Sequence, residues 1–542
     1  MLLPPAATYE ALVANFSWDI PPRFNIGLAC ADAWAVREPG RVALIACDAA
    51  GRITPTTYGE LKALSDRLAR ALRARSIGRG DRVALLLPQS VEATVGHLAA
   101  YKLGAIAVPL AALFGSDALR YRLATSGARA LITDAAGWTK VEALRADLPD
   151  LAAVVCTDGP AGAAEGWREA LEPHAEPFAA ADTGPDDPAL MIFTSGTTGP
   201  PKGALHGHRV LIGHLPGFAY SHEFLPQPGD RVWTPSDWAW AGGLLNALLP
   251  SLYYGVPVVF GPFARFDPEA AFGLMAKAEV RNAFLPPTAL RMMRAVNNIP
   301  PLHLRTIGSA GESLGRETYE WARTALGITV NEFYGQTECN YVLGSCAALG
   351  VTRAGAIGKP IPGHQAMVID ADGRRATPET LGEIAIHRSD PSMFLEYWRD
   401  PQATTAKFRG DWMLTGDLGI TDDEGYVRFV GRNDDIITSS GYRIGPSEIE
   451  DCLATHPAVA LAAAVGKPDA LRTEIVKAFV VLKPGVSPSV ELAEEIRLFV
   501  RAHLSAAEYP REIAFVDEIP LTTSGKVIRR GFRERARREA ED

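Results

Sequence analysis

The chain has 542 residues, of which 47% are hydrophobic and 22% are charged. This length exceeds what one ordinary hydrophobic core supports, so we expect a globular protein of at least two domains. The formal net charge of −9 argues against a nucleic-acid-binding protein, whose surface needs clustered positive charge.

Cysteine spacing and the N-terminus bear on where the protein works. The six cysteines are scattered and include no C-x-x-C pair, which predicts reduced thiols rather than a disulfide framework or a zinc site. The first residues lack the basic region and apolar core of a signal peptide, and no run is apolar enough to span a bilayer. We therefore predict a cytoplasmic enzyme without a membrane span.

From about residue 40 onward, short apolar runs alternate with segments of helical periodicity. This alternation predicts a layered α/β fold whose ligands bind at the carboxyl ends of strands. The first predicted strands are 41–48, 82–88, 105–110 and 129–134, and the first helices are 58–76 and 90–103.

A glycine-rich loop at 194–203 follows an apolar run at 189–193 that we interpret as a buried strand. Glycines let a backbone fold closely around an anion, while hydroxyls and a lysine add donors and positive charge. The loop differs from a Walker A motif because Gly203 stands where a Ser or Thr should hold magnesium. An ordinary surface turn is the alternative. The candidate phosphate-binding residues are Thr194, Ser195, Gly196, Thr197, Thr198, Gly199 and Lys202.

The second half continues with predicted strands at 256–261, 283–287, 304–308 and 329–334. After Asn433 the pattern becomes that of a separate small α+β domain of about a hundred residues. Its first helix is predicted to open at Ser447, with Glu450 in capping-box spacing. Strands at 459–465 and 475–482, a helix and a last strand follow. We place the domain boundary between residues 433 and 434.

The loop at 194–203 resembles the signature of the adenylate-forming superfamily, which contains acyl-CoA synthetases, luciferases and peptide-synthetase adenylation domains. Six further segments resemble that superfamily's motifs in its order and cover most of the chain. They are Ala310-Gly311-Glu312-Ser313, Tyr334-Gly335-Gln336-Thr337-Glu338, Thr415-Gly416-Asp417, Gly431-Arg432-Asn433-Asp434-Asp435, Ser440-Gly441-Tyr442-Arg443 and Pro520-Leu521-Thr522-Thr523-Ser524-Gly525-Lys526.

The resemblance implies a large α/β N-terminal domain (1–433) that binds AMP and a small mobile α+β C-terminal domain (434–542). It implies ATP, Mg²⁺ and coenzyme A as small-molecule partners, with a carboxylic acid as the acyl substrate. A carboxylate becomes a good acyl donor by attacking the α-phosphate of ATP, and the site must supply positive charge where these anions meet.

Roles follow from the resemblance, residue by residue. Catalysis falls to Lys526, Thr337 and Glu338, with Glu338 also the magnesium ligand. Asp434 is the hinge, and Ser440 and Gly441 line the coenzyme A tunnel. The residues implied for ATP and AMP, besides the phosphate loop, are Gly311, Glu312, Tyr334, Gly335, Gln336, Thr337, Asp417, Arg432 and Arg443; Arg443 could equally form a structural ion pair.

The acyl pocket is expected near Trp238, Trp240 and Gly243, where the family lines its carboxylate site. Plain core packing is the alternative for the tryptophans. Acetyl-CoA synthetases generally carry a tryptophan at the position of Gly335, so a glycine there implies room for more than two carbons. Cys339-Asn340 departs from the family's common Thr-Gly pair, which leaves the acyl specificity open.

The leading hypothesis is a ligase that makes acyl-CoA from a short- to medium-chain or branched fatty acid. An aromatic acid–CoA ligase, an enzyme loading a separate carrier protein, a luciferase-like oxygenase and a binding-only relative remain alternatives. The segment around Lys526 is similar to sites where lysine acetyltransferases and deacetylases act. The sequence leaves the oligomeric state open.

His206 and His208 fit no standard zinc spacing and are interpreted as local hydrogen bonders.

Overall fold

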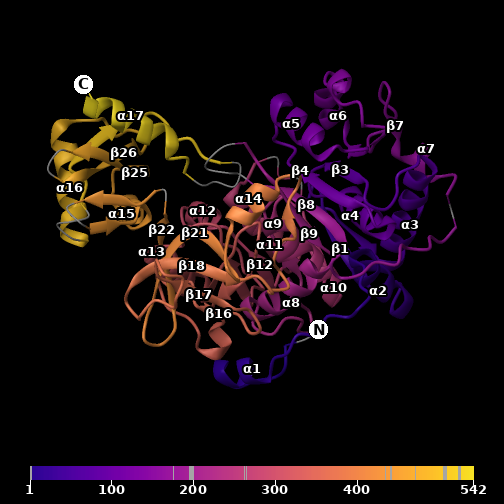
Figure 1. The fold of residues 1–542 in the computed structure, drawn as a ribbon, viewed down its shortest axis with the longest axis horizontal. Coiled ribbons are helices and arrows are strands. Elements are labelled where there is room, and N and C mark those ends of the chain that lie inside the picture. The colour runs from indigo at the N-terminus through magenta and orange to yellow at the C-terminus, as the bar shows by residue number, and fades with distance from the viewer. Residues whose placement is uncertain are drawn as a thin grey trace.

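The computed structural model describes residues 3–174, 176–194, 200–261, 263, 265–433, 435–439, 442–469, 472–504, 509–522 and 527–541. The side chains of Tyr442, Arg443, Glu448 and Glu541 lie outside this description. The chain folds into a large N-terminal domain and a small C-terminal domain, the latter drawn in gold at the left of Figure 1. The predicted fold class, mixed α/β with a small α+β domain, is confirmed.

An eight-stranded sheet carries the strand that leads into the glycine-rich loop. Its inner strands read as continuous apolar runs because helices cover both faces of a parallel sheet. The edge from β8 outward is antiparallel, so β9 returns directly beside β8. In spatial order the strands are β19 (Glu396–Tyr397), β9 (Gly203–Gly207), β8 (Pro188–Phe193), β4 (Ile106–Leu110), β3 (Arg82–Leu86), β5 (Ala130–Thr133), β6 (Ala153–Cys156) and β7 (Glu165–Gly166).

A nine-stranded sheet lies beside it and contains β14, the strand that carries Tyr334. Its central strands are parallel, so their carboxyl ends meet at one edge, where ligands of α/β proteins bind. In spatial order the strands are β16 (Lys359–Pro360), β15 (Leu343–Gly344), β14 (Val330–Tyr334), β13 (Thr306–Ser309), β12 (Asn282–Phe284), β10 (Val232–Trp233), β11 (Val258–Phe260), β1 (Val42–Cys47) and β2 (Ile53–Thr57).

A third, antiparallel sheet completes the large domain and places Asp417 directly opposite Arg432. It consists of β17 (Ala366–Ile369), β18 (Leu381–His387), β21 (Trp412–Thr421) and β20 (Phe408–Arg409), with β22 (Val427–Arg432) paired to β21. The helices of the large domain are α1 (Tyr9–Asn15), α2 (Ala33–Arg37), α3 (Tyr58–Ala74), α4 (Val91–Leu103), α5 (Ser116–Ser126), α6 (Ala135–Glu142), α7 (Trp167–Leu171), α8 (Arg209–Ser221), α9 (Ala241–Gly243), α10 (Leu249–Tyr254), α11 (Pro268–Lys277), α12 (Pro287–Met293), α13 (Arg316–Trp321) and α14 (Pro401–Ala406).

The small domain is one sheet with helices on both faces. One apolar cluster joins the sheet to α15 and α16, and another, which includes Phe479 stacked on Phe532 at 4.4 Å, joins it to α17. The elements are β23 (Ile437–Ser439), β24 (Tyr442–Ile444), α15 (Pro446–Ala454), β25 (Val459–Asp469), β26 (Thr473–Leu482), α16 (Val490–His503), β27 (Glu512–Phe515) and α17 (Arg530–Glu541).

The start of α15 corrects one prediction. The helix begins at Pro446, one residue before the predicted Ser447, and its N-cap Gly445 offers no side-chain cap. Proline suits the first helical position because its fixed φ is already helical and its missing N–H has no intrahelical partner to lose. The capping box expected at Glu450 is therefore wrong, and that carboxylate instead binds Arg529.

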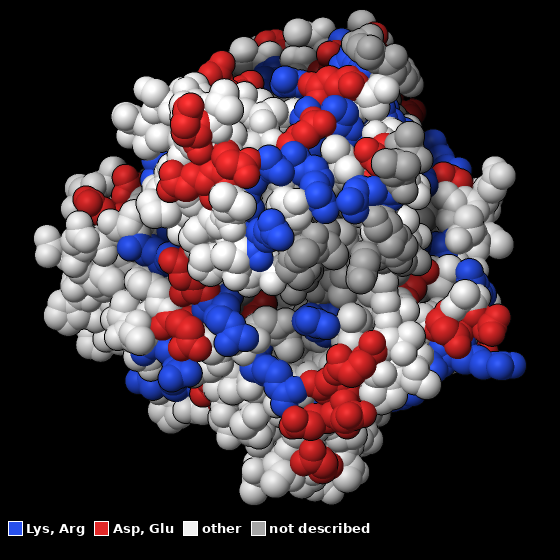
Figure 2. All heavy atoms as spheres, turned by 90° about the vertical axis from the view of Figure 1, so that its left-hand side faces the viewer, with Lys and Arg blue, Asp and Glu red and all other residues white. Residues whose placement is uncertain are grey.

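The surface and the thiols agree with the composition. Figure 2 shows the small-domain side of the molecule, where acidic and basic side chains are interspersed and neither sign covers the face. All six cysteines are buried thiols. Within the described part of the chain, no helix is both long enough and apolar enough to cross a membrane.

Candidate functional site

The carboxylate of Asp417 is the meeting point of two sheets. Its Oδ2 accepts the Tyr334 hydroxyl and the Gln336 side-chain amide, each at 2.5 Å, and its Oδ1 accepts Nη1 of Arg432 at 3.1 Å. Gln336 also donates to the carbonyl of Thr415 at 2.9 Å. A carboxylate has about four acceptor positions, so this one holds three protein donors and keeps capacity for a ligand hydroxyl.

The base of the glycine-rich loop is closed by its two ends. The N–H of Thr194 donates to the carbonyl of Lys202 at 2.8 Å, and the N–H of Lys202 lies 3.4 Å from the Thr194 hydroxyl. The intervening phosphate-loop candidates Ser195, Gly196, Thr197, Thr198 and Gly199 lie outside the described residues. The two described ends of the segment therefore lie side by side, and its role as a phosphate cradle stays a prediction.

Glu338 and Lys202 are brought together by a tyrosine that the motifs did not include. The Tyr397 hydroxyl donates to Oε1 of Glu338 at 2.5 Å, and Nζ of Lys202 lies 5.4 Å from the centre of the Tyr397 ring. Burial, and then the neighbouring Glu338 charge, raise the pKa of Tyr397, so its proton stays on the phenol. Oε2 of Glu338 accepts no hydrogen bond from a described residue. A carboxylate oxygen of this kind is a suitable ligand for a hard cation.

The segment predicted to contact adenine turns sharply at Gly311, whose φ of +104° favours glycine. The Glu312 carboxylate is held by the protein, because it accepts the Thr288 hydroxyl at 2.8 Å and pairs with Arg291. Next to it, the Ser313 hydroxyl donates to Asp451 of α15 at 3.0 Å. The adenine segment of the large domain therefore touches the small domain directly.

The two histidines after the loop are buried and neutral. Burial lowers the pKa of His206 to about 3 and that of His208 to about 4. Nδ1 of His208 accepts the N–H of Ile26 at 3.2 Å, which confirms the interpretation of this residue as a local hydrogen bonder. No group of three or more His, Cys, Asp or Glu side chains that could hold a metal occurs among the described residues.

The residues expected to line the acyl pocket are buried or half-buried and pack against neighbouring side chains and backbone. Trp238 is 3% exposed and packs edge-on against Phe260 at 5.5 Å, as the core-packing alternative proposed. Trp240 is half-buried and packs against Phe114 at 5.7 Å. Gly243 lets its helix approach the preceding turn, since a Cβ there would lie 2.4 Å from the Asp237 carbonyl. Acyl contacts of these residues stay predictions.

Gly335 lies where the chain approaches itself closely. A Cβ on this residue would lie 2.4 Å from the backbone N of Tyr341 and 2.7 Å from Cα of Asn340. This close approach explains why glycine occupies the position, and the room expected here for a longer acyl group stays a prediction. Behind this contact, Tyr341 stacks on Phe333 at 4.0 Å and Phe284 packs on Phe333 at 5.4 Å.

Several predicted residues cannot be placed. Lys526, the hinge residue Asp434 and the coenzyme A residues Ser440 and Gly441 lie outside the described residues, as does the side chain of Arg443. Thr337 is described and half-buried, between Gln336 and the buried Glu338.

Sequence reasoning missed Tyr397, Arg291, Glu332 and Asp451. Tyr397, Arg291 and Asp451 contact motif residues that lie 59, 21 and 138 positions away along the chain, and Glu332 lies just before the motif that begins at Tyr334. Burial raises the pKa of the Glu332 carboxyl to about 8, against a donated hydrogen bond from the N–H of Leu314 that lowers it. Burial also raises the pKa of Asp451 to about 6, although Arg291 opposes that shift.

Comparison with known proteins gives two family matches. A family model described as AMP-binding enzyme matches residues 31–398, and one described as AMP-binding enzyme C-terminal domain matches residues 448–526.

Individual relatives are similar over nearly the whole chain. The acetyl-coenzyme A synthetase of Bacillus subtilis (strain 168) is 35% identical over 492 residues, covering 88% of this chain and 84% of that protein. The mitochondrial acyl-coenzyme A synthetase ACSM3 of Mus musculus is 31% identical over 546 residues, covering 98% and 93%. The crystal structure of the anthranilate CoA ligase AuaEII in complex with anthranoyl-AMP superposes with a TM-score of 0.88 at 26% identity, covering 97% and 99%.

The raised pKa of Glu332 predicts a pH-dependent stability change in Glu332→Gln. The folded state keeps the proton up to a pKa of about 8, whereas the glutamate carboxyl of the unfolded chain loses it near 4.5. This group therefore lowers the stability of the native protein progressively as pH rises between these values. Glutamine resembles the protonated form, so its melting temperature relative to the native protein should rise from about pH 5 to about pH 9.

The matched control is Glu320→Gln, on the surface of the same domain. Its difference from the native protein should change little across this pH range. A difference for Glu332→Gln that is equally independent of pH would contradict the assignment of a raised pKa to Glu332.

Proposed function

The chain belongs to the AMP-binding enzymes, within the acyl-CoA synthetase branch of the adenylate-forming superfamily, and on this premise we propose a residue-level mechanism for its reaction. The reaction is ATP-dependent: a carboxylic acid becomes an acyl-adenylate, and coenzyme A then takes the acyl group, releasing AMP. The observation that carries the residue assignments is the convergence of Tyr334, Gln336 and Arg432 on Asp417.

In the first step the carboxylate oxygen attacks the α-phosphorus and pyrophosphate leaves. We assign the β- and γ-phosphates to the loop at 194–203, where Lys202 supplies positive charge beside Glu338. Asp417 accepts from the ribose hydroxyls, with Arg432 beside it, and Thr337 donates to the α-phosphate. Lys526 is assigned the position between the two reacting anions, where its charge lowers the barrier as they meet.

Mg²⁺ would bind at Glu338 and there neutralise charge on the phosphate oxygens. The residues fit this ion, because Oε2 of the Glu338 carboxylate accepts no hydrogen bond from a described residue and is therefore available to a hard cation. Tyr397 fixes the orientation of this carboxylate through its other oxygen. The remaining ligands would be phosphate oxygens and water.

In the second step the coenzyme A thiolate attacks the acyl carbonyl and AMP leaves with the bridging oxygen. We propose that the domains divide at 433/434 and that the small domain turns about Asp434 between the two steps. This withdraws Lys526 and brings Ser440 and Gly441 to the coenzyme A path. The contact between Ser313 and Asp451 supports the proposal, since it joins the nucleotide segment to the domain that turns.

For the acyl group we propose a short- to medium-chain or branched fatty acid, with an aromatic acid as the alternative. The support is the buried apolar cluster of Tyr341, Phe333 and Phe284 next to the motif that begins at Tyr334, which we propose forms one wall of the acyl site. An apolar wall disfavours charged or strongly polar acyl groups because it leaves their polar atoms without partners. The similarity to an anthranilate CoA ligase supports the alternative of an aromatic acid.

A panel of acids tests the reaction and the acyl class together. With ATP, Mg²⁺ and coenzyme A, we expect AMP and pyrophosphate release to peak with an apolar acid between butyrate and octanoate, or with benzoate. AMP release should depend on coenzyme A. Pyrophosphate exchange without thioester formation would indicate an enzyme that loads a carrier protein, and no turnover with any acid would indicate a binding-only relative.

We further propose that the protein works in the cytoplasm, where its six buried thiols would stay reduced.

We also propose that a lysine acetyltransferase and a deacetylase regulate Lys526. Acetylation removes the charge on which adenylation relies. Full acetylation should abolish adenylation and leave thioester formation from synthetic acyl-adenylate nearly unchanged. Mass spectrometry measures the modification, and unchanged adenylation after complete acetylation of Lys526 would rule out this mode of regulation.

A further inference from the structure

The loop that carries Lys526 is closed at its base by backbone pairing. Leu521 and Val527 form an antiparallel bridge, and the N–H of Ile528 donates to the carbonyl of Pro520 at 2.9 Å. These contacts tie the two ends of the loop to each other. They do not fix the direction in which the loop as a whole points, so a further anchor is needed.

Arg529 supplies such an anchor immediately after the loop. Its Nε donates to Oε1 of Glu450 at 2.7 Å, its Nη2 pairs with Oε2 of the same residue, and its Nη1 donates to Asp435 at 3.2 Å. The side chains of Arg529, Glu450 and Asp435 are 15%, 12% and 9% exposed, respectively. A fork-shaped, two-point contact of this kind restricts orientation as well as distance.

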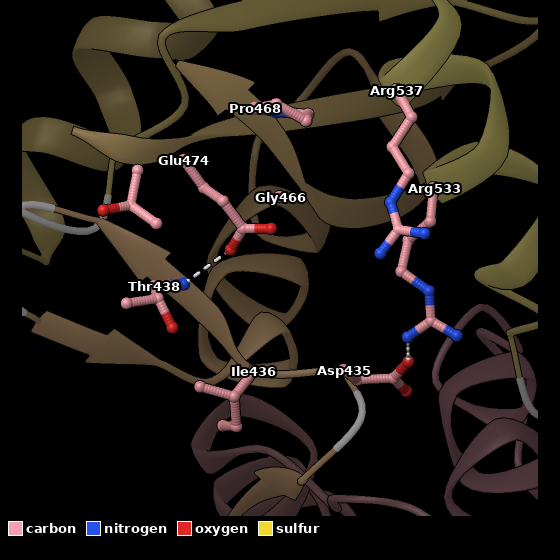
Figure 3. A pocket seen from close by; sticks show the side chains of 9 residues that line it. Asp435, Ile436, Thr438, Gly466, Pro468, Glu474, Arg533 and Arg537 are labelled. Atoms are coloured by element: carbon pink, nitrogen blue, oxygen red, sulfur yellow. Dashed lines mark hydrogen bonds and ion pairs between the residues drawn. The ribbon is translucent and has the colours of Figure 1, made fainter. Parts of the chain in front are cut away.

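The acidic partners of Arg529 are themselves held from other directions. Oδ1 of Asp435 pairs with Arg533 of α17, as Figure 3 shows at the edge of a cavity beside the hinge. Oε1 of Glu450 also accepts the N–H of Ala464 in β25 at 2.9 Å. The cluster therefore links the end of the lysine loop to the residue after the hinge, to α15 and to the central sheet.

Packing of α17 does not require this cluster. Phe532 and Ala536 bury that helix against Phe479, with the two rings stacked at 4.4 Å. Placing several charges in a poorly solvated position has a desolvation cost that apolar side chains would avoid. A geometric role for the cluster explains why charged residues occupy this place.

We propose that Arg529 is a positioning residue for adenylation: its contacts with Glu450 and Asp435 set the direction in which the Lys526 loop leaves the small domain. Asp435 follows the hinge residue directly, so turning the domain about the hinge carries the oriented loop with it. The inference rests on the proposed function of Lys526 in the first half-reaction. It assigns no contact with substrate to Arg529.

The test uses the full-length enzyme and measures the two half-reactions separately. Arg529→Met removes the fork and keeps most of the apolar stem. A displacement of about 1 Å at a reacting group costs about 100-fold in rate, so the adenylation kcat should fall by roughly that factor, with the KM for ATP unchanged. Thioester formation from synthetic acyl-adenylate and coenzyme A should proceed at the native rate. Arg529→Lys should show the same split with a smaller loss.

Two controls separate the explanations. Arg530→Met removes the neighbouring arginine, which is 66% exposed and, among the described residues, pairs with Glu534 one turn along the same helix, and should change neither half-reaction. Lys526→Ala should abolish adenylation alone; if it does not, the proposed role of Lys526 fails first. If Lys526→Ala behaves as expected but Arg529→Met leaves adenylation intact, or slows both half-reactions equally, the positioning role is overturned. Should Arg529→Met fail to fold, Glu450→Gln weakens the same fork and must show the same split.

Discussion

The proposed nucleotide site depends on one carboxylate, that of Asp417, which three donors from separate parts of the fold hold in place. Tyr334 and Gln336 come from the end of β14 in the nine-stranded sheet, and Arg432 lies opposite Asp417 on β22 of the antiparallel sheet. The contact thus fixes two sheets relative to each other. The contacts of Tyr334 and Gln336 with Asp417 also help to position Thr337 and Glu338, because these two residues continue the same short segment.

Two adjacent acidic residues on α15 make different kinds of contact. Asp451 reaches across to Ser313 and Arg291 of the large domain, whereas Glu450 binds Arg529 within its own domain. Figure 1 shows α15 on the side of the small domain that faces α12, α13 and β22. A rotation at the proposed hinge would therefore rearrange the Asp451 contacts and leave the Glu450 contacts intact.

Local pattern predicted several buried strands of the two large sheets and the first two long helices, but neither the antiparallel sheet of the large domain nor the long-range contacts. Strands β1, β3, β4 and β5 were predicted to within about two residues, because buried parallel strands are continuous apolar runs. Helix α17 was not predicted, since it is mostly charged and only Phe532 and Ala536 bury it. Tyr397 was missed because it meets Glu338 only in the folded chain. The close approach of residues 340–341 to Gly335 was not predicted, because it depends on the path of the chain after the motif.

Transfer of oxygen from the acid to AMP tests the proposed chemistry most directly. If the carboxylate attacks the α-phosphorus, an acid labelled with ¹⁸O in both oxygens leaves one ¹⁸O atom in each AMP released, because the bridging oxygen departs with the nucleotide when coenzyme A attacks the carbonyl. Mass spectrometry of the AMP after turnover with ATP and coenzyme A measures this transfer. Label in every AMP molecule is the expected result. Unlabelled AMP, with ¹⁸O found instead in orthophosphate or pyrophosphate, would contradict the acyl-adenylate and with it the roles assigned around Asp417, Glu338 and Lys526.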